Sequence, residues 1–430
     1  MRLTCNLFFL FISFISINLF GQGASQTPFG QFGIGDVETL ANARQTAMGG
    51  IGLSMPSNGY INNINPALTA YNRTNVVFEA GLHGQYLNIT NSTSSQTIAS
   101  ANVHYLSILF PITAKNWTVT VGLAPYSNAN TRFTSVRNII EDTITNKVNN
   151  QVVVEGGLSQ IYMSHGIKLP KGFAIGLTTT YIFGNISRKN IDFVTVPTHT
   201  TSTHMNSQEV YRFLELKLGL SYYKKLSESY NFNAGATIGS SLDLGSTRTL
   251  INGIYKEFTL LYRDTSSSIG KNIALPPSIK IGFSIDKNNR WNAGVDYTFT
   301  QWSQYSGFTS ENVFLNSHRI SVGAEIIPDY YASTGYLKRV LYRLGAYYHA
   351  TPYELRSKSA TTMEGTRIDE MGVSLGFGFP FGKGNATSLN ASATMGQRGT
   401  IANDLIMEQF FKFNLSFTIN DRWFIRYKLD

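Results

Sequence analysis

The sequence predicts an all-β fold: a transmembrane antiparallel β-barrel of about 14 strands with an N-terminal hatch or plug segment in the lumen. Three observations predict it. Charged residues make up only 14% of the 430 residues, well under the usual quarter. Aromatic residues reach 13% while the mean hydropathy is only −0.09. Apolar and polar residues alternate in one segment after another. Together these features indicate a sheet with one face in lipid and the other in water.

Alternation is the strongest signal along the chain. It is clear in "VVFEAGLHGQY" (76–86), "GFAIGLTTTYIFG" (172–184) and "SIKIGFSID" (278–286). The polar positions are mostly Gly, Ser, Thr and Asn. Soluble β-sandwich domains are the alternative, but a sandwich would place large charged residues on its wet face. Small neutral residues there favour a barrel lumen that is partly filled by other protein.

Fourteen segments are predicted as strands, and short and long connections alternate between them, as in outer-membrane barrels with periplasmic turns and external loops. The predicted strands are 75–88, 100–112, 116–128, 152–168, 172–187, 209–223, 230–242, 276–286, 290–303, 316–328, 339–350, 366–381, 386–398 and 408–420. The long connections include 129–151, 187–208 and 242–275. The last of these contains "LINGIYKEFTLLYRD", which could form a hairpin of its own and raise the count to sixteen.

The first 23 residues read as a cleaved signal peptide. Arg2 precedes the apolar run "LFFLFISFISINLF" (7–20), and small residues follow at 21–25. A membrane anchor is the alternative, but this run is shorter than the roughly 20 residues that a helical span needs. Cleavage removes Cys5, the only cysteine, and Arg2, so the formal charge falls from +9 to +8. The mature chain therefore has no Cys-based metal site.

Residues 24–74 precede the first strand and lack alternation, which predicts a segment folded inside the barrel. A lumen of fourteen strands is too wide for its own side chains to fill. Gly49 and Gly50 permit positive φ or close backbone approach, and Asn65 can bond neighbouring backbone beside Pro66 and Ala67.

The stretch "ANARQTAMGGIGLSMPSNGYINNINPALT" (41–69) resembles the N-terminal hatch of the FadL family of outer-membrane transporters of hydrophobic compounds. Downstream, "LPPSIKIGFS" (275–284), "WNAGVDYTFTQWSQY" (291–305), "RISVGAEIIPD" (319–329) and "YRLGAYYHATPYE" (342–354) are similar to family segments in family order. The resemblance implies a fourteen-stranded barrel with a hatch. One departure is that "NDRWFIRYKLD" (420–430) follows the final strand, so that residues 421–430 form either a periplasmic tail or strand extension, or a contact surface for another subunit.

No catalytic constellation is visible, and no enzyme activity, cofactor or metal site is predicted. The seven histidines are scattered singly, with only His199 and His204 sharing a loop. The strand parities point nine charged residues into the lumen: Glu79, Glu215, Lys217, Lys280, Asp296, Arg319, Glu325, Arg343 and Lys412. Either these residues pair with each other and pin the hatch, or Lys280, Arg319 and Arg343 hold a ligand carboxylate.

Two functions remain open for a barrel in the Gram-negative outer membrane. The resemblance implies hatch-gated, passive uptake of hydrophobic small molecules such as long-chain fatty acids. The alternative is a docking or adaptor subunit of a larger outer-membrane secretion or assembly complex, for which the long external loops and small polar lumen positions are suited. The expected partners are outer-membrane lipid and lipopolysaccharide, attracted by the basic charge, and a fatty acid or outer-membrane proteins. Nucleic acid is not expected, since no basic run supports it.

Overall fold

The computed structural model describes residues 27–421, apart from 73, 114–115, 142–143, 197–198, 258, 271–272, 309–313, 356–364 and 382–386. The predicted signal peptide and residues 422–430 of the predicted tail lie outside the described residues. Within the described part of the chain, no helix is long and apolar enough to cross a membrane.

Fourteen antiparallel strands of the described chain close into a barrel, because the last strand pairs with the first from Met407↔Thr90 to Asp421↔Val76. The predicted strand number is therefore confirmed. The ring strands are β2 (Val76–Thr90), β3 (Ser95–Thr113), β4 (Trp117–Asn128), β6 (Ile144–Lys168), β7 (Phe173–Val196), β8 (His199–Lys225), β9 (Tyr230–Asp243), β12 (Ser278–Lys287), β13 (Trp291–Thr300), β14 (Ser317–Ile326), β15 (Leu341–Leu355), β16 (Thr366–Phe381), β17 (Thr387–Gly399) and β18 (Met407–Asp421).

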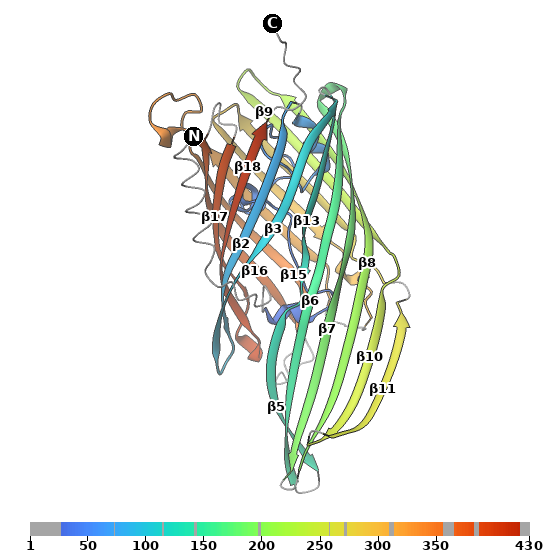
Figure 1. Cartoon of the computed structure of the whole chain (residues 1–430). Coiled ribbons are helices and arrows are strands. Elements are labelled where there is room, and N and C mark those ends of the chain that lie inside the picture. Colours follow the sequence, from blue (N-terminus) through green and yellow to red (C-terminus); the bar gives the residue numbers. More distant parts are fainter. Residues whose placement is uncertain are drawn as a thin grey trace, which may run out of the picture.

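One side of the barrel continues far beyond the other strands as a tall extension of the sheet (Figure 1). We call this extension the blade. It consists of β5 (Thr131–Glu141), β10 (Thr247–Lys256), β11 (Thr259–Ile269) and the parts of β6, β7 and β8 that pair with them. The prediction of long loops at 129–151 and 187–208 was wrong, because most of these residues are paired strand. The hairpin suspected within 242–275 exists as β10 and β11, but it joins the blade and leaves the ring at fourteen.

The outer face of the ring is apolar in the expected alternating pattern. Its exposed large side chains occupy every second position, as in β8 (Leu216, Leu218, Leu220), β12 (Ile279, Ile281, Phe283, Ile285) and β16 (Met371, Val373, Leu375, Phe377). The residues between them face inward. This belt is the surface that a membrane barrel presents to lipid.

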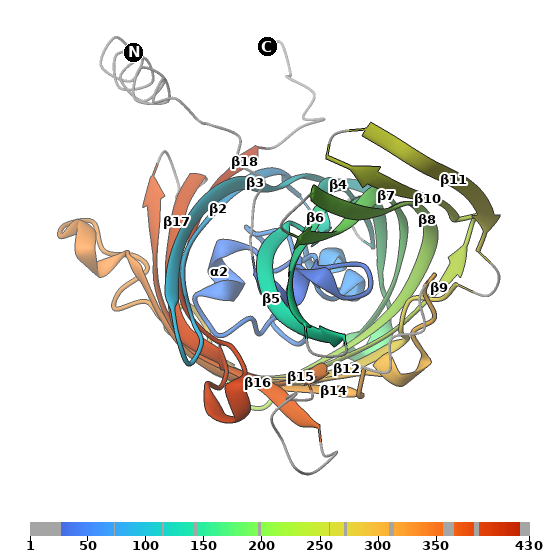
Figure 2. The same cartoon turned by 90° about the horizontal axis from the view of Figure 1, so that it is seen from below.

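Residues 27–72, which we call the N-terminal segment, lie inside the ring (Figure 2). They contain short elements only: η2 (Pro28–Gln31), β1 (Asp36–Val37), α2 (Ala43–Thr46) and η3 (Pro66–Tyr71). The remaining short helices lie in connections: η4 (Pro170–Gly172), η5 (Trp302–Gln304), η6 (Tyr336–Lys338) and η8 (Ala402–Asp404). The buried core includes the packing of this segment against the inner wall and a cluster at the root of the blade that contains Ile182, Ile186 and Phe213.

Candidate functional site

The N-terminal segment is fixed to the wall by a buried ion-pair network. Asn42 caps α2 in a capping box with Gln45, which places Arg44 toward β14. Arg44 binds Glu325 in bidentate fashion, with Nε to Oε2 at 3.0 Å and a terminal nitrogen to Oε1 at 2.8 Å. From β15, Arg343 Nε donates to the same Oε2 at 2.6 Å. One carboxylate is thus shared by two guanidinium groups, which satisfies its charge in a buried position.

Two further carboxylates of the wall receive backbone N–H groups of the segment. Asp296 in β13 accepts from Gly52 N at 2.7 Å and Leu53 N at 3.0 Å. Glu79 in β2 accepts from Ile61 N at 3.2 Å and from the Tyr105 hydroxyl at 2.6 Å. These contacts satisfy peptide groups that have no secondary-structure partner, so they set the path of an irregular chain.

The predicted hatch motif lies close against the wall. Gly49 and Gly50 have φ values of 72° and 90°. Asn65 caps η3 by accepting from Ala67 N at 3.0 Å, and its amide donates to Leu53 O at 2.8 Å. Pro66 and Ala67 lie directly on wall glycines, where a side chain would overlap them. The wall glycines against the segment include Gly166, Gly176, Gly219, Gly235, Gly282, Gly323, Gly345 and Gly376.

At the blade end, the first residues of the segment are held by a second charged cluster. Arg398 in β17 donates to Asp36 at 2.9 Å and lies 4.3 Å from the centre of the Phe29 ring. Thr27 donates to Glu408 in β18. β1 pairs with β4, and Arg188 in β7 donates to the Gly33 carbonyl, which ties the segment to the root of the blade.

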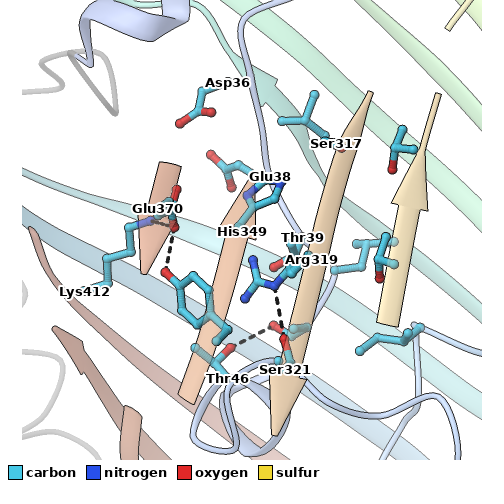
Figure 3. A pocket seen from close by; sticks show the side chains of 18 of the residues that line it. Asp36, Glu38, Thr39, Thr46, Ser317, Arg319, Ser321, His349, Glu370 and Lys412 are labelled. Carbon is cyan, nitrogen blue, oxygen red and sulfur yellow. Dashed lines mark hydrogen bonds and ion pairs between the residues drawn. The ribbon is translucent and has the colours of Figure 1, made fainter. Parts of the chain in front are cut away.

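A cavity of about 390 Å³ remains between the segment and the wall (Figure 3). Its lining includes many ionisable side chains among small and apolar residues. The cations are Lys217, Lys280, Arg319, Arg398 and Lys412, the acids are Asp36, Glu38, Glu215, Asp296 and Glu370, and the histidines are His83, His104 and His349. Sites for apolar ligands are lined mainly by hydrophobic and aromatic side chains, and this cavity differs from them.

Some of the cavity charges are engaged by the protein itself. Glu38 lies 3.7 Å from His104 Nδ1. Burial opposes ionisation of Glu38, but its interactions with His104, His83 and Lys412 outweigh burial and hold the pKa of Glu38 below its usual value. Lys412 lies 3.9 Å from Glu370, which also accepts from the Tyr347 hydroxyl at 2.6 Å.

The three cations predicted to bind a ligand are not brought together. Lys280 and Arg319 line the cavity, whereas Arg343 is buried in the network with Glu325 and donates to Asn390 at 2.9 Å. Arg319 donates to the Gly49 carbonyl at 3.2 Å and lies 3.9 Å from the centre of the Tyr347 ring. Within the described residues, Lys217 and Lys280 have no ion-pair partner within 4.0 Å. The other predicted lumen charges do face inward.

Sequence reasoning missed Arg44, Glu38 and Arg398. Arg398 follows the alternation of β17, so the parity rule could have placed it in the lumen. Arg44 and Glu38 belong to the irregular segment, where periodicity gives no direction. An indirect signal existed for Arg44. A carboxylate in the lumen at Glu325 requires a nearby cation, and Arg44 is the only arginine or lysine in the N-terminal segment.

The family model of BamG matches residues 4–430. The chain belongs to the BamG family. No curated protein matches it. Among solved structures, it resembles the CymD monoaromatic hydrocarbon channel with 13% identity, a TM-score of 0.59, and coverage of 91% of this chain and 99% of CymD. The Ralstonia pickettii toluene transporter TbuX follows with 13% identity, a TM-score of 0.58, and coverage of 88% and 97%.

A Pseudomonas aeruginosa FadL homologue matches with 12% identity, a TM-score of 0.57, and coverage of 89% of this chain and 99% of that chain. At such low identity these matches establish the fold. The expected likeness to FadL-type barrels is therefore confirmed: this BamG-family chain has the architecture of a FadL-like outer-membrane channel.

Proposed function

We propose that this protein is a closed barrel of the Gram-negative outer membrane that serves as a docking subunit of a larger assembly, with the blade as its contact element. The observation that carries the proposal is the fixed N-terminal segment, which we interpret as the hatch. Wall carboxylates in β2, β13 and β14 bind it, and the space that remains is lined with charges. Moving this segment would break the buried ion pair between Arg44 and Glu325 and expose the carboxylates of Asp296 and Glu79 without their backbone donors, which is costly.

The blade supports a docking role independently of the segment. Every described position of β11 is exposed, and large apolar side chains are among them: Leu260, Leu261, Tyr262 and Ile269. Exposed apolar clusters of this kind mark interaction surfaces. Among the residues that the structure describes, β11 has residue-by-residue pairing with β10 only, so its second edge offers backbone donors and acceptors to a partner.

Native mass spectrometry after mild extraction from the native membrane tests the proposal. We expect the wild-type protein to remain bound to other outer-membrane proteins. A Leu260→Ser, Leu261→Ser, Tyr262→Ser variant should lose them while its barrel still resists unfolding in detergent. Thr265→Ala and Ser267→Ala, in the same strand, form the matched control. A wild-type monomer that carries a single lipid-sized mass would contradict the docking role.

The second candidate is hatch-gated uptake of hydrophobic small molecules, and the likeness to the hydrocarbon and toluene channels favours it. In this case Lys280 and Arg319 would hold the carboxylate of a ligand such as a long-chain fatty acid. Binding of a spin-labelled fatty acid to the purified protein tests it. Lys280→Ala together with Arg319→Ala should then weaken binding by at least roughly tenfold, the loss of about 1.4 kcal/mol. Lys225→Ala is the control variant, because Lys225 is exposed at the end of β8 and does not line the cavity. Arg343→Lys is unsuitable as a control because it disturbs the buried network.

A further inference from the structure

The connection between β14 and β15 exposes an unusual number of large side chains. We call residues 327–340 the aromatic turn. Its Tyr331 is 77% exposed and its Leu337 67%, and Tyr330 and Tyr336 are also exposed. Single exposed apolar residues are normal on a protein surface, but four within eight residues form a patch that needs a partner.

The aromatic turn is an ordered structure, so this display is fixed. Asp329 N donates to Lys338 O at 2.8 Å and closes the turn around η6. The Tyr331 hydroxyl accepts from Asn289 Nδ2 at 2.8 Å, across the neighbouring turn. The Tyr342 hydroxyl in β15 donates to Leu337 O at 3.2 Å. The first bond closes the turn, the second restrains the hydroxyl of Tyr331, and the third restrains the backbone of Leu337.

The aromatic turn continues the lipid-facing surface of the barrel. It projects sideways from the ring, level with the short-turn ends of the neighbouring strands (Figures 1 and 2, orange). The strand residues beside it belong to the apolar belt: Ile326 and Leu344 are both exposed, and Tyr342 packs edge-on against Phe377 with ring centres 5.8 Å apart. A structure that extends sideways from the belt lies along the leaflet rather than away from it.

The charge and residue composition of the aromatic turn indicate the kind of surface to which it binds. Lys338 and Arg339 follow the exposed tyrosines, and the Arg339 guanidinium lies 5.5 Å from the centre of the Tyr336 ring. Tyrosines favour the headgroup level of a bilayer, where the ring is in apolar surroundings and the hydroxyl is wet, and basic residues there attract anionic lipids. We propose that the aromatic turn binds the headgroup region of the leaflet at the short-turn end, with a preference for anionic phospholipid.

The inference does not depend on the proposed docking function, because the blade is at the opposite end of the barrel. A protein partner on the aromatic turn is the competing occupant. Continuity with the belt and the sideways direction favour lipid over protein.

The test uses the absence of cysteine after position 5. In a Cys5→Ser background, Tyr331→Cys and Leu337→Cys are labelled with bimane and reconstituted into vesicles of phosphatidylcholine and phosphatidylglycerol brominated along the acyl chains. We expect lipid bromine to remove most of the fluorescence at both positions, as it does for a Leu344→Cys label in the belt, while aqueous iodide has little effect. A label at Glu228→Cys, in the exposed β8–β9 turn at the same end, should be quenched by aqueous iodide and little affected by lipid bromine.

The dependence on headgroup charge has its own variant. Lys338→Ala with Arg339→Ala should abolish the extra quenching that phosphatidylglycerol gives over pure phosphatidylcholine. Strong iodide quenching at 331 and 337 without lipid quenching would overturn the proposal. Protection from both quenchers would overturn it as well, because protein would then cover the aromatic turn. Two label positions keep the test valid if one variant fails to fold.

Discussion

Arg44 and Glu325 form a bidentate ion pair across 281 residues of sequence, and this pair joins the N-terminal segment to the barrel wall. Its position explains why an irregular segment with few charges contains this arginine. Because Arg343 binds the same carboxylate, one acidic side chain orients two cations from different elements.

Replacement of Glu325 by Gln should destabilise the protein strongly. The change leaves two buried guanidinium groups without a counter-charge, and breaking a buried pair in this way costs about 3–5 kcal/mol. The measurement is the urea midpoint at which the barrel loses its resistance to unfolding in detergent. Glu155→Gln is the matched control, because Glu155 is half exposed in its pairs with Arg132 and Lys189 and should matter by less than about 0.5 kcal/mol. Equal midpoints for the two variants would contradict the role of the network.

Replacement of Gly345 by Ala should displace the N-terminal segment from the wall. A Cβ at this position overlaps the backbone of Met48 and Gly49, and such overpacking costs about 1–3 kcal/mol. We expect faster cleavage of the segment by an added protease in detergent, with the barrel strands still protected. Gly59→Ala, where a Cβ would meet only the amide of Asn420 at 3.7 Å, should cleave at the wild-type rate. Identical protection of both variants would show that the segment tolerates the overlap.

Mild acid should remove the contribution of Glu38. Its pKa in the folded protein lies below the usual value of 4.5 for a glutamate, so the stability that it adds is present above about pH 4.5 and is lost as the pH falls through the lower, folded value. The groups that face it and favour its ionised form are His104, His83 and Lys412. Wild type and Glu38→Gln should therefore differ in thermal midpoint at neutral pH and converge in acid. A difference that persists unchanged well below pH 4 argues against this assignment.

Alternation predicted the ring and its lumen charges but not the blade. In the ring, one face contacts lipid, so every second residue must be apolar, and the inward direction of Glu325 and Arg343 follows from parity alone. In the outermost strand of the blade, β11, every described position is exposed, so both of its faces contact water. Asn150, Asn190 and Asp192 lie on neighbouring strands and are joined by hydrogen bonds of the Asn150 amide, yet in sequence they read as polar loop. A sheet with two wet faces leaves no periodic signal.

The site was only partly predictable for a related reason. Parity gives the side of the wall on which a residue lies, and this correctly placed Lys280 and Arg319 at the cavity. It cannot give the path of the N-terminal segment, which is set by contacts with residues far away in sequence. Asp296 was therefore recognised as a lumen residue, while its partners, the N–H groups of Gly52 and Leu53, were not.

Replacement of Asp296 by Ala should loosen the closed barrel. The change leaves the Gly52 and Leu53 N–H groups buried without an acceptor, and each such group costs about 1–3 kcal/mol. The segment turns here toward Asn65, so its release should open part of the lumen. In planar bilayers we expect rare, small openings for the wild-type protein and frequent openings for Asp296→Ala. Asp296→Asn retains one acceptor oxygen and should remain nearer to wild type. If wild type and Asp296→Ala conduct equally, Asp296 does not keep the barrel closed, and the segment must be held by the Glu325 network and the wall glycines.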